Sequence, residues 1–247
     1  MANVRNLVAR ALRKAAFVVE PPRQPIDASD LYTTWLCFAN AGMLDRGNLY
    51  LIDYALSRIR TSSPMIEIGS FCGLSANVLT HFKRKHGLKN HLITCDKWDF
   101  ENEDADRVHV AGSPVLFSDY RHFVRESYLR TTGLFSADDL PFTVEAMSDE
   151  FFEKWKKGET VQDVRGRALP LGGPVSFCYI DGNHTYEGSK QDFLNCDAFL
   201  EPGGFLLFDD SAEHQFGVWR LMPEVLATGR YKLSATNPNH LFQKLGV

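Results

Sequence analysis

The sequence predicts an α/β fold: a doubly wound, mainly parallel sheet that ends in an antiparallel hairpin and carries a helical cap at its N-terminus. Short apolar runs without alternation recur along the chain and are separated by helical patterns, which is typical of parallel strands buried on both faces. The last two runs, 231–234 and 241–245, are only six residues apart. That gap is too short for a crossover helix, so these two strands should pair antiparallel.

Residues 1–60 are predicted to form the helical cap. From Val4 to Val19 the apolar residues keep helical spacing, and the arginines lie off that stripe. The prolines at 21, 22 and 25 stop this helix, and two more helical stretches follow at 31–40 and 48–60. The basic first helix also has the pattern of an organelle transit peptide. We expect a structural helix that packs on its own domain or makes a homo-oligomer.

Residues 61–247 are predicted to form the main domain, with an irregular insertion at about 101–173. Its buried strands are expected at 65–68, 91–95, 175–180 and 204–208, and its helices at 74–86, 185–200 and 216–227. Within the insertion we expect a helix at 116–130, a strand at 142–147 and an exposed excursion at 159–173. The acidic stretch 101–106 is interpreted as a solvated loop.

Charge and composition exclude several classes of protein. The 247 residues contain 27 Lys and Arg against 31 Asp and Glu, a net charge of −4, which argues against a nucleic-acid partner. No apolar run approaches the roughly 18 residues of a membrane span. The five cysteines are scattered without a C-x-x-C pair, which favours a reducing compartment and a cytoplasmic protein.

The first candidate site is a glycine turn at 67–75, Glu-Ile-Gly-Ser-Phe-Cys-Gly-Leu-Ser, between a strand and a helix. Glycines let the backbone pass close to a ligand, and the following helix presents free N–H groups. Gly69 and Gly73 give the spacing G-x-x-x-G, not the G-x-G-x-x-G of dinucleotide sites. Because Glu67 precedes the first glycine by two residues, the turn suits a cationic amine. A glycine turn without a ligand is the alternative.

The second candidate site is Asp96, at the carboxyl end of the next strand. A carboxylate there can accept hydrogen bonds from both hydroxyls of a ribose. Trp98, two residues on, offers a surface on which adenine could stack. The alternative makes Asp96 a helix cap and Trp98 a core residue.

Three aspartates and a histidine form the third candidate site. Asp181, Asp209 and Asp210 end two buried strands, so they should converge beside the glycine turn. Three carboxylates would repel one another unless a cation lay between them, and oxygen ligands favour Mg²⁺ or another hard divalent ion. His184 can reach the same space and remove a proton from a hydroxyl. As an alternative, Asp181 and Asp209 cap the helices that follow them.

With these residues together, residues 40–247 resemble class I S-adenosylmethionine-dependent methyltransferases. More narrowly, the chain is similar to the family of macrocin-type O-methyltransferases and cephalosporin-hydroxylase-like proteins. The resemblance is carried by the glycine turn, by Asp96, by the block Asp-Gly-Asn-His-Thr-Tyr-Glu at 181–187, and by Pro-Gly-Gly at 202–204 with Asp-Asp at 209–210. Catechol-type O-methyltransferases resemble this layout but carry a lysine at the position of His184.

The resemblance implies a seven-stranded, Rossmann-like sheet and a role for each candidate residue. The S-adenosylmethionine site would comprise Glu67, Gly69, Ser70, Gly73, Ser75, Asp96, Trp98 and Asp181. Mg²⁺ would be bound by Asp181, Asp209 and Asp210, and His184 would be the general base. Contacts from Met147 and Ser148 to the cofactor are left open, because the third strand could not be aligned.

The expected function is Mg²⁺-dependent methyl transfer from S-adenosylmethionine to a hydroxyl of a small molecule (a sugar, polyketide or phenol) in natural product biosynthesis. Three alternatives stay open at this point. One is an NAD-dependent oxidoreductase, which the missing dinucleotide motif disfavours. The others are a non-catalytic cofactor-binding scaffold and a hydroxylase-like member of the same family.

Overall fold

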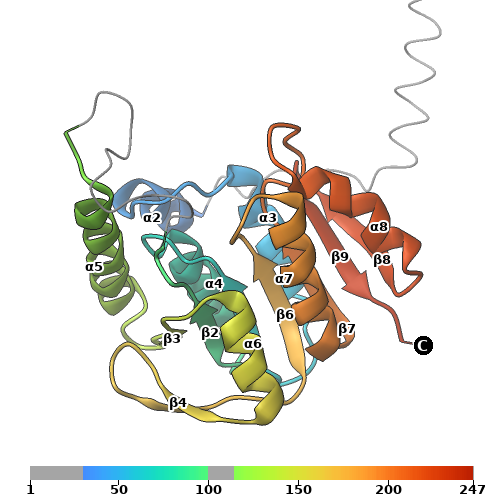
Figure 1. The fold of residues 1–247 in the computed structure, drawn as a ribbon, viewed down its shortest axis with the longest axis horizontal. Coiled ribbons are helices and arrows are strands. Elements are labelled where there is room, and N and C mark those ends of the chain that lie inside the picture. The colour runs from blue at the N-terminus through green and yellow to red at the C-terminus, as the bar shows by residue number, and fades with distance from the viewer. Residues whose placement is uncertain (1–29, 100–113, 247) are drawn as a thin grey trace, which may run out of the picture.

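The computed structural model describes residues 30–99 and 114–246. A seven-stranded sheet has the order β3-β2-β1-β6-β7-β9-β8 (Figure 1). Its strands are β1 (Met65–Ile68), β2 (Leu92–Cys95), β3 (Phe142–Val144), β6 (Val175–Ile180), β7 (Leu200–Phe208), β8 (Tyr231–Thr236) and β9 (His240–Lys244). The first five pair in parallel, whereas β9 is antiparallel to both β7 and β8. The predicted mixed sheet with a terminal hairpin is confirmed.

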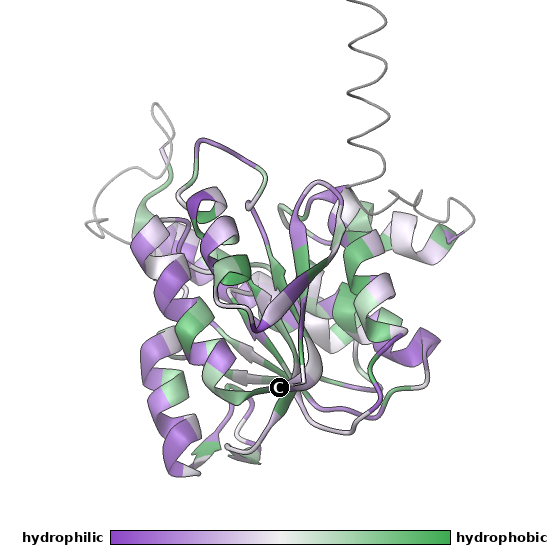
Figure 2. Cartoon of the chain, turned by 90° about the vertical axis from the view of Figure 1, so that its right-hand side faces the viewer, coloured by the Kyte–Doolittle hydropathy of each residue, from purple (hydrophilic) through white to green (hydrophobic). Residues whose placement is uncertain are grey.

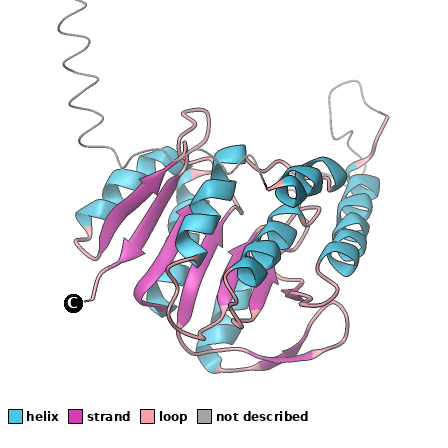
Figure 3. Ribbon diagram, turned by 180° about the vertical axis from the view of Figure 1, so that it is seen from behind, coloured by secondary structure: helices cyan, strands magenta, loops and turns pink. Residues whose placement is uncertain are grey.

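Helices cover both faces of the sheet (Figures 2 and 3). One layer contains α3 (Arg46–Leu56) and α4 (Leu74–Lys85), with α2 (Leu31–Ala39) and α5 (Phe117–Phe135) packed on α4. The other layer contains α6 (Ser148–Lys157), α7 (Tyr186–Phe199), the 3₁₀ turn η1 (Val218–Leu221) and α8 (Met222–Ala227). None of the described helices is long and apolar enough to cross a membrane.

The strands are apolar on both sides because each helical layer closes its own core. In β1, Ile66 and Ile68 belong to the cluster under α6 and α7, while Met65 belongs to the cluster under α3 and α4. Side chains alternate along a strand, so Glu67 points to the α4 side. The absence of alternation in the sequence was therefore a correct sign of a doubly covered sheet.

Within the predicted helical cap, the described residues contain α2 and α3, which share a hydrophobic core with the sheet, and the division into a cap and a main domain stays a prediction. The helix expected before residue 20 and the acidic stretch 101–106 lie outside the described residues. The expected insertion is more regular than its composition indicated, because α5, β3 and α6 are part of the main fold. Among the described residues of this region, 159–173 leave the sheet as the small antiparallel hairpin of β4 (Thr160–Gln162) and β5 (Ala168–Pro170).

The order of the strands determines where a ligand can bind. β1 lies between β2 and β6. The chain runs outward from β1 through β2 to β3 on one side, and from β6 to β7 on the other. In open α/β sheets, ligands bind outside the carboxyl ends of the strands at such a switch point. The glycine turn, Asp96 and Asp181 all follow strands that end at this edge.

Candidate functional site

The glycine turn between β1 and α4 is closely packed under the neighbouring loop. Gly69 has φ +79°, and a Cβ atom built on it would lie 1.9 Å from the carbonyl oxygen of Asp181. Gly73 is the N-cap of α4 with φ +89°, and a Cβ there would meet Thr131 at 3.0 Å. Both positions therefore need glycine for conformation and for space. Gly69, Ser70 and Phe71 of this turn border the cavity.

Asp96 holds this turn in shape. Its carboxylate accepts the backbone N–H of Ser70 at 2.7 Å and of Phe71 at 2.9 Å, and the N–H of Trp98 at 2.6 Å. Phe71 and Trp98 both have positive φ, which is uncommon for residues other than glycine. Burial raises the pKa of Asp96, while the three N–H donors act in the opposite direction. Asp96 thus orders two loops of one pocket.

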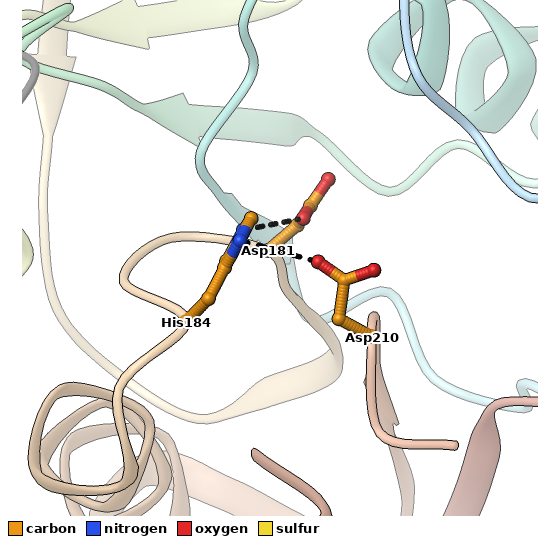
Figure 4. A group of neighbouring side chains, drawn as sticks. All are labelled: Asp181, His184 and Asp210. Carbon is orange, nitrogen blue, oxygen red and sulfur yellow. Dashed lines mark ion pairs between the residues drawn. The ribbon is translucent and has the colours of Figure 1, made fainter. Parts of the chain in front are cut away.

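Asp181, His184 and Asp210 come together at the carboxyl ends of β6 and β7, with ligand atoms that all lie within 4.8 Å of one another (Figure 4). His184 Nδ1 lies 3.2 Å from a carboxylate oxygen of Asp210, and Nε2 lies 3.6 Å from one of Asp181. All three side chains are partly exposed. The imidazole therefore lies between two carboxylates and remains accessible.

Charge repulsion changes the protonation of this group. Partial burial, together with the nearby charge of Asp209, raises the pKa of Asp181 well above its usual range and that of Asp210 to about 6. A hydrogen bond to Asp181 raises the pKa of His184, with the nearby carboxylate charges acting in the same direction. Strongly perturbed groups that share a cleft are typical of functional sites.

A cavity of about 900 Å³ joins these residues. Its wall includes most of the predicted site: Gly69, Ser70, Ser75, Asp96, Trp98, Asp181, His184 and Asp210. It also includes residues that the sequence did not single out, among them Met43, Tyr120, Gln191, Glu213, Gln215 and Phe216. Met147 and Ser148, which were left open, line it too. A volume of this size is ordinary for a cofactor or small-molecule site.

Comparison with known proteins identifies the domain. A family model described as a methyltransferase domain matches residues 66–211, more than half of the chain. The chain belongs to this methyltransferase family. A search of curated proteins finds no match.

Solved structures share the methyltransferase fold. An O-methyltransferase from Bacillus cereus in complex with SAH has 12 % identity, a TM-score of 0.54, and coverage of 96 % of this chain and 97 % of the other. CalS11, a TDP-rhamnose 3'-O-methyltransferase of calicheamicin biosynthesis, has 15 % identity, a TM-score of 0.54, and coverage of 96 % and 93 %. The O-methyltransferase TomG from Streptomyces achromogenes, in complex with SAM, has 16 % identity, a TM-score of 0.50, and coverage of 83 % and 82 %. These matches confirm the predicted Rossmann-like methyltransferase fold.

Trp98 and Glu67, which are predicted to bind the cofactor, are both buried in the structure. Trp98 is only 2 % exposed; its indole N–H donates to the carbonyl of Phe71, and its ring packs against Tyr128. These are the contacts of a core residue, and adenine stacking on Trp98 stays a prediction. Glu67 is fully buried beneath the turn, and neither carboxylate oxygen has a hydrogen-bond partner among the described residues. Burial raises the pKa of Glu67 well above its usual range.

Asp209, predicted as a metal ligand, is not part of the group formed by Asp181, His184 and Asp210. Its side chain is 5 % exposed and does not line the cavity. The tandem aspartates diverge: the first enters the core, and the second faces the cavity. The sequence could not show this, because adjacent residues at a strand end carry no signal for the direction of each side chain once the strand is over.

Proposed function

We propose that this methyltransferase is an O-methyltransferase that transfers the methyl group of S-adenosylmethionine to a hydroxyl of a small molecule, assisted by a divalent cation. One observation carries the proposal: the Asp181–His184–Asp210 group and the glycine turn line the same cavity. An acid–base group thus lies beside the segment that the fold uses for ligand binding.

The part of the cavity near the glycine turn suits the cofactor. Gly69 and Ser70, in the turn before α4, line this part of the cavity, and Ser75 lies in the first turn of that helix. The charged residues of the wall are mostly acidic, which favours a ligand that carries an ammonium and a sulfonium. Asp96 lines the same space and is held by three backbone donors, so its remaining acceptor capacity has a fixed direction towards a ribose.

The carboxylates also fit a metal ion. Asp181 and Asp210 lie on either side of His184, and the charge of Asp210 adds to the burial and the charge of Asp209 that raise the pKa of Asp181; a divalent cation between the two carboxylates would remove this repulsion. Oxygen donors suit Mg²⁺ or another hard ion. When bound, such an ion lowers the pKa of a hydroxyl group and fixes its orientation. Asp181 and Asp210 are the residues that would hold it.

His184 is the proposed general base. It removes the proton from the acceptor hydroxyl, and the oxygen then attacks the methyl carbon while S-adenosylhomocysteine leaves. Without a cation, the two flanking carboxylates favour the imidazolium form of His184. His184 acts only when its imidazole is neutral, so neutralisation of the carboxylates by a cation would also lower its pKa towards the working range.

The acceptor would enter beside His184. Phe216 packs against His184, and Gln215 and Met43 line the same cavity, so that its wall mixes apolar with polar surface, which suits a hydroxylated small molecule. We propose a sugar, polyketide or phenol of natural product biosynthesis as acceptor, and a cytoplasmic enzyme without nucleic-acid substrates. A homo-oligomer through the first helix is part of the same proposal.

Methyl transfer can be tested with a panel of acceptors that carry neighbouring hydroxyls: catechols, glycosides and hydroxylated polyketides. The protein is incubated with S-adenosylmethionine and Mg²⁺, and mass spectrometry identifies a product that has gained one methyl group. We expect His184→Gln to lower kcat by about 10²- to 10⁴-fold with unchanged cofactor affinity. The exposed His214 lies on the neighbouring loop outside the cavity wall, so His214→Gln is the matched control.

Three outcomes would contradict parts of this proposal. Full turnover by His184→Gln would refute the role of His184 as general base. Undiminished turnover in the presence of a chelator would refute the requirement for a divalent cation. A product that gains oxygen instead of a methyl group would assign the hydroxylase alternative.

A further inference from the structure

The buried carboxylate of Asp209 is surrounded by hydrogen-bond donors. Its Oδ1 accepts from Asn48 Nδ2 at 2.8 Å, from Asn239 Nδ2 at 2.5 Å and from the backbone N–H of Asp210 at 3.0 Å. The hydroxyl of Tyr179 donates to Oδ2. A buried carboxylate without such donors would be strongly destabilising. Here four donors compensate the charge.

These donors come from segments that are far apart in the sequence. Asn48 lies in the first turn of α3, and Asn239 lies in the turn between β8 and β9. Asn239 Nδ2 also donates to Asn48 Oδ1 at 3.1 Å. The two segments are in close contact, because a Cβ atom on Gly47 would lie 1.6 Å from the carbonyl oxygen of Asn237. Asp209 thus joins the N-terminal helices to the C-terminal hairpin.

The next residue, Asp210, faces the opposite way. It has φ +51°, an uncommon backbone conformation for aspartate, and its carboxylate points to His184 (Figure 4). Unfavourable backbone conformations persist where the surroundings hold them in place. The hydrogen bond from the Asp210 N–H to the Asp209 carboxylate supplies such a restraint.

From this arrangement we infer that Asn48 and Asn239 are positioning residues: by fixing the Asp209 carboxylate, they hold Asp210 in the orientation that completes the Asp181–His184–Asp210 group. The inference rests on the proposed function, since it concerns residues assigned there to the metal and the base. It gives the N-terminal helices and the C-terminal hairpin a part in catalysis, although neither amide touches the reacting atoms.

Loss of either amide leaves the Asp209 carboxylate short of a donor. The side chain then rotates towards its remaining donors, and its bond to the Asp210 N–H changes. Residues that orient metal ligands typically contribute about 10- to 100-fold to metal affinity. We therefore expect Asn48→Ala and Asn239→Ala to weaken Mg²⁺ binding about tenfold or more, with S-adenosylmethionine affinity unchanged.

Asn77 provides the matched control. It is as deeply buried, donates to Asn40 Oδ1 at 2.6 Å and accepts from the Ser136 hydroxyl at 2.6 Å, in a network without Asp209. Asn77→Ala should lower the melting temperature as the other two variants do, yet retain wild-type Mg²⁺ affinity. Should an alanine variant fail to fold, Asn48→Ser and Asn239→Ser are the replacements, because serine keeps a donor and removes less volume.

The experiment is calorimetric titration of the metal-stripped, full-length variants with Mg²⁺, repeated in an Asp209→Asn background. If Asn48 acts through Asp209, Asn48→Ala should have little further effect on Mg²⁺ affinity once Asp209 is Asn. Equal Mg²⁺ affinity of Asn48→Ala, Asn239→Ala and Asn77→Ala would overturn the inference, as would full additivity with Asp209→Asn.

The proposed function can fail separately. If the wild-type protein binds no divalent cation, the metal part of that function is refuted, and crystal structures of the two alanine variants decide the positioning. Asp210 leaving its positive φ in these variants would support the inference. Asp210 unchanged, with its carboxylate still beside His184, would overturn it.

Discussion

The ring of Phe216 lies edge-on to the imidazole of His184, with the ring centroids 4.9 Å apart and the planes at 73°. Two carboxylates lie beside the nitrogens of His184 and act in the plane of the imidazole. The phenyl ring of Phe216 packs against the imidazole and limits its tilting. The loop of Phe216 is itself anchored, because the N–H of Gly217 donates to the carbonyl of His184 at 2.8 Å.

Removal of this contact should affect the chemical step. We expect Phe216→Ala to lower kcat about tenfold, since a loosened base spends less time in a productive orientation. Cofactor affinity should stay at the wild-type value, because Phe216 lies on the acceptor side of the cavity. Steady-state kinetics with Phe216→Leu alongside measures this. If only KM for the acceptor rises, Phe216 contacts the acceptor and does not position the base.

Asp96 should contribute to both cofactor affinity and stability. Asp96→Ala removes the acceptor for three backbone N–H groups of two adjoining loops, so we expect S-adenosylmethionine binding to weaken about 100-fold and the melting temperature to fall by several degrees. The control is Asp99→Asn, which removes a charge from an exposed side chain at the same cavity. If Asp96→Ala and Asp99→Asn bind S-adenosylmethionine equally well, the loss of a negative charge alone explains the change in affinity, and Asp96 does not act by ordering the two loops.

Two glycines with positive φ should respond differently to alanine. Gly69→Ala places a methyl group on the Asp181 carbonyl, and the three nearest atoms all belong to the backbone of Asp181 and Gly182. Gly87, with φ +67°, has nothing within 4 Å of its Cβ position, so Gly87→Ala should cost only about 1 kcal/mol of backbone strain. Chemical denaturation compares the two. Gly69→Ala should be much less stable and lose cofactor binding, and similar stability of the two variants would show that the turn can move.

In the metal-free protein, Asp210 should contribute less to stability as the pH rises. A carboxyl group with a higher pKa in the folded state adds stability below its unfolded pKa, and that stability is lost as the pH rises to the folded value. For Asp210 this window runs from the ordinary pKa of 3.8 to about 6. Wild type should therefore lose melting temperature relative to Asp210→Asn across this window, and saturating Mg²⁺ should restore it above pH 6. If the difference in melting temperature between wild type and Asp210→Asn stays constant across this window, the pKa of Asp210 is not raised.

Most of the fold could be predicted from periodicity. Unalternated apolar runs indicated strands covered on both faces, and the short gap before 240 indicated the hairpin. The region after Asp99 was harder. The helix expected at 116–130 and the strand expected at 142–147 correspond to α5 and β3, but α6 was not expected, so a regular part of the fold was interpreted as an insertion.

The sequence predicted which residues gather at the candidate site better than it predicted the direction and burial of their side chains. The motif at 181–187 and the tandem aspartates gave the right neighbourhood, but not the burial of Asp209 or of Trp98. Those depend on tertiary partners, such as Asn48 and Asn239, that lie far away in sequence. Asn48 did carry a signal: it precedes Ile52 by four residues, on the helix face whose other members are apolar, and a polar residue there must find a buried partner.

Cofactor binding tests the central claim most directly. Metal-stripped protein is titrated calorimetrically with S-adenosylmethionine, with NAD⁺ as the control ligand, and then with Mg²⁺. The account predicts saturable binding of S-adenosylmethionine, no heat with NAD⁺, and a separate Mg²⁺ signal that Asp210→Asn weakens. Binding of NAD⁺ without S-adenosylmethionine, or of neither ligand, would contradict it.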